Sequence, residues 1–358
     1  MPNPDPPPIP HRVLIIRPSA LGDVCRSVPV AVSLRRAWPD ATIDWLVQDA
    51  FAAAIETHPA LTRTVLFPRR RFGSRLRRGR VGEFWSWLGE LRRAKYDLVL
   101  DCQGLLRSGV FAWCTRAPRR VGFADARELG WLGINNRVRV PANMHTVDRM
   151  LELVRALGVE PVRDMRLYAD AAARQRVGGD PALAGLRFVL VAPTSRWAGK
   201  RWPPDRFAAA ARQLLGRGAD AIVLVGAPSE REQVGPLMDL ASREPRVIDR
   251  IGRTSIGDLM ALVEASALVI ANDSAPLHMA VGFDRPIVAL FGPTRTDRVG
   301  PYQRDSDVIQ HVNAGEELDH KNEAAGRAMM ERISVEDVVG ASVARLSRRS
   351  SPHDAAQQ

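Results

Sequence analysis

The segment NDSAPLHMA (residues 272–280) places an amide, a carboxylate, a hydroxyl and an imidazole directly after the apolar run ALVIA. A buried core needs none of these groups, and a surface turn rarely needs all of them together. Asp273 and Ser274 precede Pro276, a residue favoured in the first turn of a helix, so we expect a helix to begin at Pro276. The free N–H groups at such a helix start can hold a pyrophosphate. The segment is therefore predicted to be an anion-binding turn, with His278 serving either the site or the core.

Two more polar groups follow apolar runs in the same half of the chain. APTSRWAGKRWPPDRF (residues 192–207) carries Thr194, Ser195 and Lys200, and lysine occurs at only three positions of the chain. Lys200 is either a compact positive charge for a phosphate oxygen or a solvated loop residue. In GAPSERE, Glu230 stands near the start of a helix. There it either takes the hydroxyl pair of a ribose or only complements the helix dipole.

The first half of the chain has one comparable segment, RPSALGDV (residues 17–24). Its glycine lets the backbone approach a ligand, and Asp23 follows at the start of a helix. Asp23 is either a helix cap, which is common, or a general base that faces a ligand.

Other sites are disfavoured by what the sequence lacks. No GxGxxG motif is present, which argues against an NAD-dependent oxidoreductase. The three cysteines have no CxxC spacing, so neither a disulfide framework nor a zinc site is expected. The DSD triplet at 305–307 has the form of a metal-binding DxD motif, but it stands alone and is interpreted as chance. We predict no metal and no cofactor.

Short apolar runs alternate with helical patterns along the whole chain, which indicates βαβ units and parallel sheets. A stretch rich in glycine and proline interrupts this alternation after residue 160. We therefore predict an α/β protein with two doubly wound domains, at residues 11–165 and 186–333, and a last helix at 334–350. Ligands of such sheets bind beyond the carboxyl ends of the strands, where the polar segments above lie.

The formal net charge of +11, with 51 Lys+Arg against 40 Asp+Glu, points to an anionic partner such as nucleic acid, anionic lipid or a phosphorylated substrate. Seven of the arginines and no acid occur between Arg69 and Arg80, followed by Phe84, Trp85 and Trp87. This insert is either a solvated loop or a patch for anionic groups. The chain start lacks the pattern of a signal peptide and no apolar run is long enough to span a membrane, so a cytoplasmic location is expected.

Taken in order, RPSALGDV, PTSRWAGKRWPPDRF, GAPSERE, NDSAPLHMA and FGPT resemble the ADP-heptose:lipopolysaccharide heptosyltransferases, over roughly residues 12–343. The resemblance implies a GT-B fold, with two Rossmann-like domains facing each other across a cleft. It also implies a metal-independent, inverting transfer of heptose from ADP-heptose or a similar nucleotide sugar. The family usually has glycine where this chain has Ala275.

The resemblance also implies roles for individual residues. Asp23 matches the general base, and Glu230 matches the acid that holds the ribose. Donor binding is implied for Thr194, Ser195, Lys200, Glu230, Asp273, Ser274, the backbone of Ala275, and His278, whose role stays open. We further assign Arg69, Arg70, Arg71 and Arg75 to an anionic lipid A-type acceptor at the inner face of the membrane. The alternatives are a related transferase for another sugar or acceptor, and a non-catalytic binder of anionic lipid or nucleic acid. No recognised nucleic-acid module is present, so no nucleic-acid partner is expected.

Overall fold

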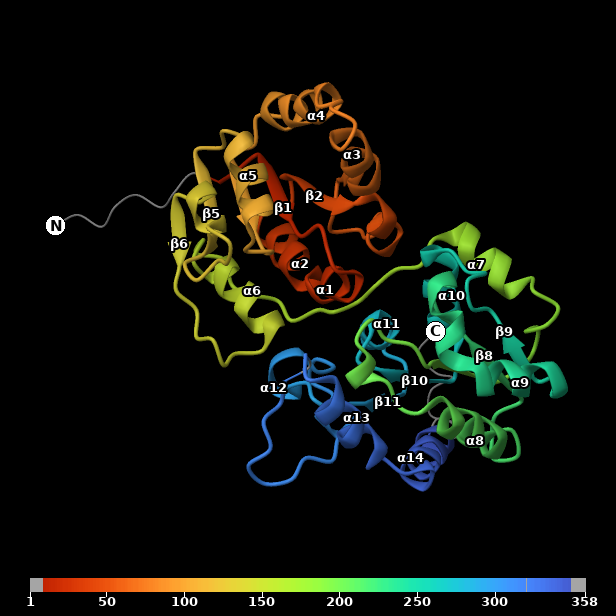
Figure 1. Cartoon of the computed structure of the whole chain (residues 1–358). Coiled ribbons are helices and arrows are strands. Elements are labelled where there is room, and N and C mark those ends of the chain that lie inside the picture. The colour runs from red at the N-terminus through yellow and green to blue at the C-terminus, as the bar shows by residue number, and fades with distance from the viewer. Residues whose placement is uncertain (1–8, 320, 349–358) are drawn as a thin grey trace. The chain divides into compact units, whose positions relative to one another are not determined.

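The computed structural model describes residues 9–319 and 321–348, so the final two residues of the predicted helix 334–350 lie outside the described part. The chain divides into two units between Met165 and Arg166 (Figure 1). Among the described residues, no helix is long and apolar enough to cross a membrane.

The first unit is a six-stranded parallel sheet with the strand order β3-β2-β1-β4-β5-β6. Its strands are β1 (Arg12–Ile16), β2 (Thr42–Gln48), β3 (Arg63–Phe67), β4 (Leu98–Asp101), β5 (Arg119–Phe123) and β6 (Asn136–Val138). Its helices are α1 (Leu21–Arg26), α2 (Val28–Ala37), α3 (Arg69–Leu76), α4 (Gly82–Arg93), α5 (Leu106–Cys114) and α6 (Thr146–Arg155), with 3-10 turns η1 (Asp49–Ala54) and η2 (Gly130–Gly133).

The second unit is another six-stranded parallel sheet, ordered β12-β11-β10-β7-β8-β9. Its strands are β7 (Phe188–Ala192), β8 (Ala221–Leu224), β9 (Val247–Asp249), β10 (Leu268–Asn272), β11 (Ile287–Leu290) and β12 (Val308–Ile309). Its helices are α7 (Ala171–Gly178), α8 (Pro204–Leu214), α9 (Gly235–Arg243), α10 (Ile256–Ala265), α11 (Ala275–Gly282), α12 (Thr296–Val299), α13 (Glu323–Glu331) and α14 (Val335–Arg348), with 3-10 turns η3 (Ala198–Lys200), η4 (Pro228–Val234) and η5 (Asp305–Asp307).

The central strands of each sheet are buried on both faces, which explains why they are almost continuous apolar runs. In β1, Leu14 and Ile16 pack with the aromatic side chains of α4 and α5. The alternate residues Val13 and Ile15, also fully buried, point to the opposite face, on which α2 and α6 contact one another. In the second unit α8, α9 and α14 cover one face, and α7, α10 and α11 pack together on the other.

Both sheets have the same strand order when the strands are counted along each unit, and it is the order of a dinucleotide-binding fold. The connections of the two central strands leave toward opposite faces, so a space opens beyond their carboxyl ends. In the first unit these strands are β1 and β4, and in the second they are β7 and β10. The predicted α/β class with two doubly wound, Rossmann-like halves is confirmed.

Local structure differs from the sequence-based expectation at several points. The arginine insert forms a helix, α3, although its charge pattern resembles a solvated loop. Helix α7 lies within the stretch that was left between the two predicted domains, because its contacts with α10 hold it on the second unit. Helix α14 buries Val338 and Leu346 in the core of the same unit. Helix α11 begins one residue before Pro276, at Ala275.

The turn that follows β4 depends on one carboxylate. Asp101 is 1% exposed, and its Oδ1 accepts the N–H groups of Gln103 (2.9 Å) and Gly104 (3.1 Å). Its Oδ2 accepts the Ser108 hydroxyl at 2.8 Å. Burial raises the pKa of Asp101 to about 6, against these hydrogen bonds.

We expect Asp101→Ala to lower the free energy of unfolding by roughly 2–4 kcal/mol, because buried N–H groups lose their acceptor. Asp101→Asn keeps a neutral acceptor oxygen and should cost less than half as much. Urea unfolding at constant m-value measures both, with the exposed Asp40→Ala as control. Equal losses for the two Asp101 variants would show that the acceptor oxygen is not what matters.

Candidate active site

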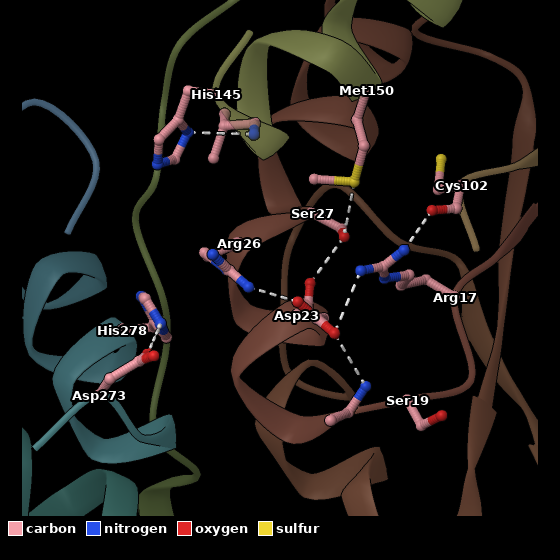
Figure 2. A network of polar contacts seen from close by, with 12 residues as sticks. Arg17, Ser19, Asp23, Arg26, Ser27, Cys102, His145, Met150, Asp273 and His278 are labelled. Atoms are coloured by element: carbon pink, nitrogen blue, oxygen red, sulfur yellow. Dashed lines mark hydrogen bonds and ion pairs between the residues drawn. The ribbon is translucent and has the colours of Figure 1, made fainter. Parts of the chain in front are cut away.

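Arg17 occupies the space between the two central strands of the first unit. It follows β1 directly, and its Nη1 donates to the carbonyl of Cys102, the residue after β4. Its Nη2 lies 3.2 Å from Asp23 Oδ2. Arg17 is 7% exposed, so one buried guanidinium both joins the two strand ends and holds the carboxylate beside them (Figure 2).

Asp23 lies in the first turn of α1, where its carboxylate contacts a backbone N–H group and two guanidinium groups. Its Oδ2 accepts the N–H of Ala20 at 3.2 Å, which caps the helix. Its Oδ1 pairs with Arg26, and its side chain keeps 26% exposure. Burial alone would raise the pKa of Asp23, but Arg17 and Arg26 outweigh burial and hold the pKa well below its usual range. The group is therefore an ionised, partly accessible carboxylate.

A polar pocket of about 200 Å³ opens beside Arg17. Three of its lining side chains are Gln103, Arg127 and Arg149. Arg149 is already engaged, since its Nη2 donates to both oxygens of Asp125 at 2.8–2.9 Å. Arginine and amide donors suit a small ligand that carries hydroxyl or acidic groups.

In the second unit, Asn272 has the bridging position that Arg17 has in the first. It ends β10, and its Nδ2 donates to the carbonyl of Pro193 beyond β7 at 2.7 Å. Its Oδ1 accepts the N–H of Trp202 at 3.1 Å. Asn272 is fully buried, and these bonds fix the loop that carries Lys200 against the end of β10.

Three of the predicted donor residues meet at this strand end. Lys200 Nζ lies 2.6 Å from Asp273 Oδ2, and both side chains are less than 15% exposed. His278 Nε2 lies 4.0 Å from the other oxygen, Asp273 Oδ1. Asp273 thus holds the lysine on one oxygen and faces the imidazole with the other. Figure 2 shows the second of these contacts, between Asp273 and His278.

Ser274 is the N-cap of α11, with Ala275 and Pro276 in the first turn. In the described part of the chain its buried Oγ has no hydrogen-bond partner. A helix start whose N–H groups are free and whose hydroxyl is unused can receive the oxygens of a phosphate.

Thr194 and Glu230 form the third contact of this half. Thr194 Oγ1 donates to Glu230 Oε2 at 2.7 Å, and the same oxygen accepts the N–H of Ala227 at 2.8 Å. Ser195 lies beside Thr194 and is buried, and its carbonyl accepts Arg201 Nε at 2.8 Å. Both hydrogen bonds fall on Oε2, so among the described contacts Oε1 of Glu230 is the oxygen that can accept a ligand hydroxyl.

The four predicted acceptor arginines separate into two pairs. Arg71 and Arg75 both pair with Glu83 of α4, Arg71 at 3.0 Å. Arg69 and Arg70 instead line a pocket of about 670 Å³. The pocket combines basic side chains with aromatic ones, and its lining includes Arg77, Arg107, Phe67, Phe72, Phe84 and Phe111.

With this geometry in view, comparison with known proteins identifies the family. The model of glycosyltransferase family 9 (heptosyltransferase) matches residues 84–326. The chain belongs to glycosyltransferase family 9. The family relationship that the motifs suggested is thereby confirmed, and the chain is a glycosyltransferase.

Individual heptosyltransferases match most of the chain. Lipopolysaccharide heptosyltransferase 1 of Pseudomonas aeruginosa is 31% identical over 304 residues, 82% of each chain. Lipopolysaccharide core heptosyltransferase OpsX of Haemophilus influenzae is 25% identical over 347 residues, 92% of this chain and 96% of its own. The structure of Escherichia coli ADP-heptose lps heptosyltransferase II matches with a TM-score of 0.77 at 20% identity, covering 95% of this chain and 100% of that one. The structural match supports the GT-B fold.

Sequence reasoning missed Arg17, Arg26 and Asn272 as parts of these sites. Both arginines stand within or beside the RPSALGDV segment, but arginine is so frequent here that its presence carried no signal. Asn272 could have been found, because a buried amide at a strand end must bond neighbouring backbone.

A close glycine contact supports the loop of Lys200. A Cβ added to Gly326 of α13 would lie 2.6 Å from the carbonyl oxygen of Gly199 in η3. We expect Gly326→Ala to displace η3, to lower the free energy of unfolding by roughly 1–3 kcal/mol and to weaken nucleotide binding.

The matched control is Gly340→Ala in α14, where nothing lies within 4 Å of the added Cβ. This change should be neutral or stabilise by up to about 1 kcal/mol. Urea unfolding and nucleotide calorimetry on both variants make the comparison. Unchanged nucleotide affinity in Gly326→Ala would show that η3 tolerates the displacement.

Proposed function

We propose that this glycosyltransferase moves a heptose from ADP-heptose to the inner core of lipopolysaccharide, with inversion and without a metal. The observation that carries the proposal is that both central strand pairs end in charged groups. Asp23 in the first unit suits proton acceptance, and Lys200 in the second suits the departing ADP. The names of the matched relatives support the sugar and the acceptor. Among the described residues no group of three or more His, Cys, Asp or Glu is placed to hold a metal ion, and Lys200 supplies positive charge at the proposed donor site.

The proposed donor site is the end of β7 and β10. Departing ADP develops negative charge on its pyrophosphate, which fixed donors stabilise at little reorganisation cost. Lys200, the Ser274 hydroxyl and the backbone N–H of Ala275 are those donors. Asp273 is itself anionic, so we assign it to positioning Lys200 and His278 rather than to phosphate contact. Thr194 and Glu230 take the adenosine ribose, with Glu230 accepting its hydroxyls.

The proposed base is Asp23. An inverting transfer requires one group to accept the proton of the attacking hydroxyl. A carboxylate with a low pKa is a weak base for a neutral alcohol. In an oxocarbenium-like transition state, however, the attacking oxygen becomes positively charged before it loses its proton, so a weak base suffices. Arg17 and Arg26 fix the carboxylate's position and keep it ionised.

The proposed acceptor is an anionic, lipid A-type core, which places the enzyme in the cytoplasm at the inner face of the membrane. Arg69 and Arg70 are the arginines available for its phosphates and carboxylates, since Arg71 and Arg75 are engaged by Glu83. The guanidinium fork suits both kinds of anion.

Calorimetry of ADP and ADP-heptose with EDTA present tests the donor site. We expect wild type to bind both, and Lys200→Ala to bind ADP roughly 10- to 100-fold more weakly, because a charged hydrogen bond is lost. Lys321→Ala, an exposed lysine of the same unit, is the control. The double variant Lys200→Ala, Asp273→Asn shows whether the loss comes only from leaving Asp273 uncompensated.

The same proteins test the base in a turnover assay with a heptose-deficient core acceptor. Asp23→Asn should keep ADP affinity within about twofold and lose roughly 10²–10⁴ in kcat. If wild type binds no ADP, the donor assignment fails and another nucleotide sugar replaces it. If Asp23→Asn turns over normally, a different group is the base.

The pH dependence of the reaction reports on Arg26. Because the pKa of Asp23 is held low, wild-type kcat/KM should show no acid limb from this group between about pH 5 and 8. Arg26→Ala removes one of the two cations, so the pKa of Asp23 rises and the acid limb of the profile should move to higher pH. Arg26→Lys keeps the charge and should keep the wild-type profile. Superimposable profiles for all three proteins would contradict the role of Arg26.

A further inference from the structure

Exposed apolar side chains gather on one face of the first unit, on α5 and the segment that ends in η2. Helix α5 contributes Leu106, Val110 and Trp113, which are spaced to share one helix face. The segment that ends in η2 contributes Leu129 and Leu132. Their exposed fractions are 47, 38, 48, 57 and 59%. All five line one hollow of about 220 Å³, and together they are the α5–η2 patch. A contiguous apolar patch marks an interaction surface, unlike scattered exposed leucines.

The patch is built by backbone packing. A Cβ added to Gly109 of α5 would lie 2.1 Å from the carbonyl oxygen of Gly130, and one added to Gly133 would lie 1.9 Å from that of Gly109. No side chain fits between α5 and η2, because three glycines bring their backbones into contact. The five side chains of the patch are therefore left on the outer surface, where they line the same hollow.

The backbone before η2 is held in an unfavourable conformation that presents one of these leucines. Glu128 and Leu129 are both left-handed, with φ values of 54° and 62°. Residues other than glycine, asparagine and aspartate rarely adopt this region, and a leucine there is strained. Leu129 is nevertheless 57% exposed, so no core contact of its side chain offsets the strain. Strain of this kind is typical of functional surfaces.

The charges around the patch are almost all positive. Between residues 106 and 139 the chain has seven arginines and two acids. Of the acids, Asp125 is already paired with Arg149. Arg116 lies over the Trp113 ring, and Arg137 lies over the ring of Trp131 in η2, each at 4.3 Å. Arginine next to an exposed tryptophan and leucines matches a bilayer interface, where anionic headgroups surround the acyl boundary.

We propose that the α5–η2 patch inserts into the interface of an anionic lipid bilayer and docks the first unit on the membrane. A second copy of the chain fits less well, because a two-fold dimer would place the arginines of one patch against those of the other. The inference rests on the proposed function only in the choice of the cytoplasmic membrane as the bilayer. Vesicle binding can be measured without a sugar donor or acceptor. It assigns docking to α5 and η2, whereas the exposed Trp85 of α4 adjoins the arginine helix α3.

Sedimentation with vesicles tests the patch, using phosphatidylethanolamine with phosphatidylglycerol at about 3:1 against pure phosphatidylcholine. Leu132→Glu and Val110→Glu place a negative charge in the patch at exposed positions, so folding should not change. Trp85→Glu is the matched control, because Trp85 is an apolar residue with an exposed fraction of 64% and lies in an equally basic region. Wild type should bind the anionic vesicles. Both patch variants should bind them at least roughly tenfold more weakly than wild type does. Trp85→Glu should bind within about twofold of wild type.

Salt and ADP calorimetry complete the experiment. Raising salt from about 0.05 M to about 0.5 M should leave part of the wild-type binding, since apolar insertion is not screened. Patch variants that bind like wild type, or Trp85→Glu that alone loses binding, would overturn the proposal. The proposal would also be overturned if wild type did not bind vesicles but formed a dimer, and if the patch substitutions converted that dimer to a monomer. If wild type does not bind vesicles but binds ADP, the docking inference fails while the proposed function stands.

Discussion

The constraint on which both units depend is the divergence of the chain at the two central strands of each sheet. Beyond β1 and β4, and again beyond β7 and β10, the connections leave to opposite faces and expose backbone groups at the strand ends. One buried polar side chain meets this requirement in each unit. Arg17 donates to Cys102 in the first, and Asn272 donates to Pro193 in the second. The groups that could do chemistry are arranged around these two bridges.

The choice of bridge sets the electrostatics of each half. A buried guanidinium needs an anion, and Asp23 provides it from the next helix, with Arg26 as a further cation on the same carboxylate. A neutral amide has no such need, so the charges of the second unit pair with each other, as Lys200 with Asp273. The first site is thus a carboxylate held by cations, and the second is a cation held by a carboxylate. These opposite arrangements are consistent with the different roles that we propose for the two sites.

The sequence predicted what depends on local pattern. Alternating apolar runs gave the two parallel sheets, and Lys200 stood out because lysine is rare in this chain. The same logic failed for Arg17 and Arg26, since a frequent residue type carries little information. The sequence failed to predict helix α3 for a related reason. Its apolar residues are Phe72 and Leu76 among arginines, and the helix depends on Arg71 and Arg75 meeting Glu83 of α4, a contact outside its own segment.

Close glycine contacts lie beyond sequence reasoning altogether, because only the fold decides which glycines meet. Two such contacts occur with opposite consequences. Gly199 and Gly326 bring η3 and α13 together beside Lys200, the last residue of η3. Gly109, Gly130 and Gly133 bring α5 and η2 together where no ligand group needs support. In the first contact, the absence of side chains at the two glycines lets η3 lie close to α13 and so holds Lys200 near the end of β10. In the second, the same omission leaves five large apolar side chains with no core to enter, which is why we interpret that surface as one whose apolar environment lies outside the protein.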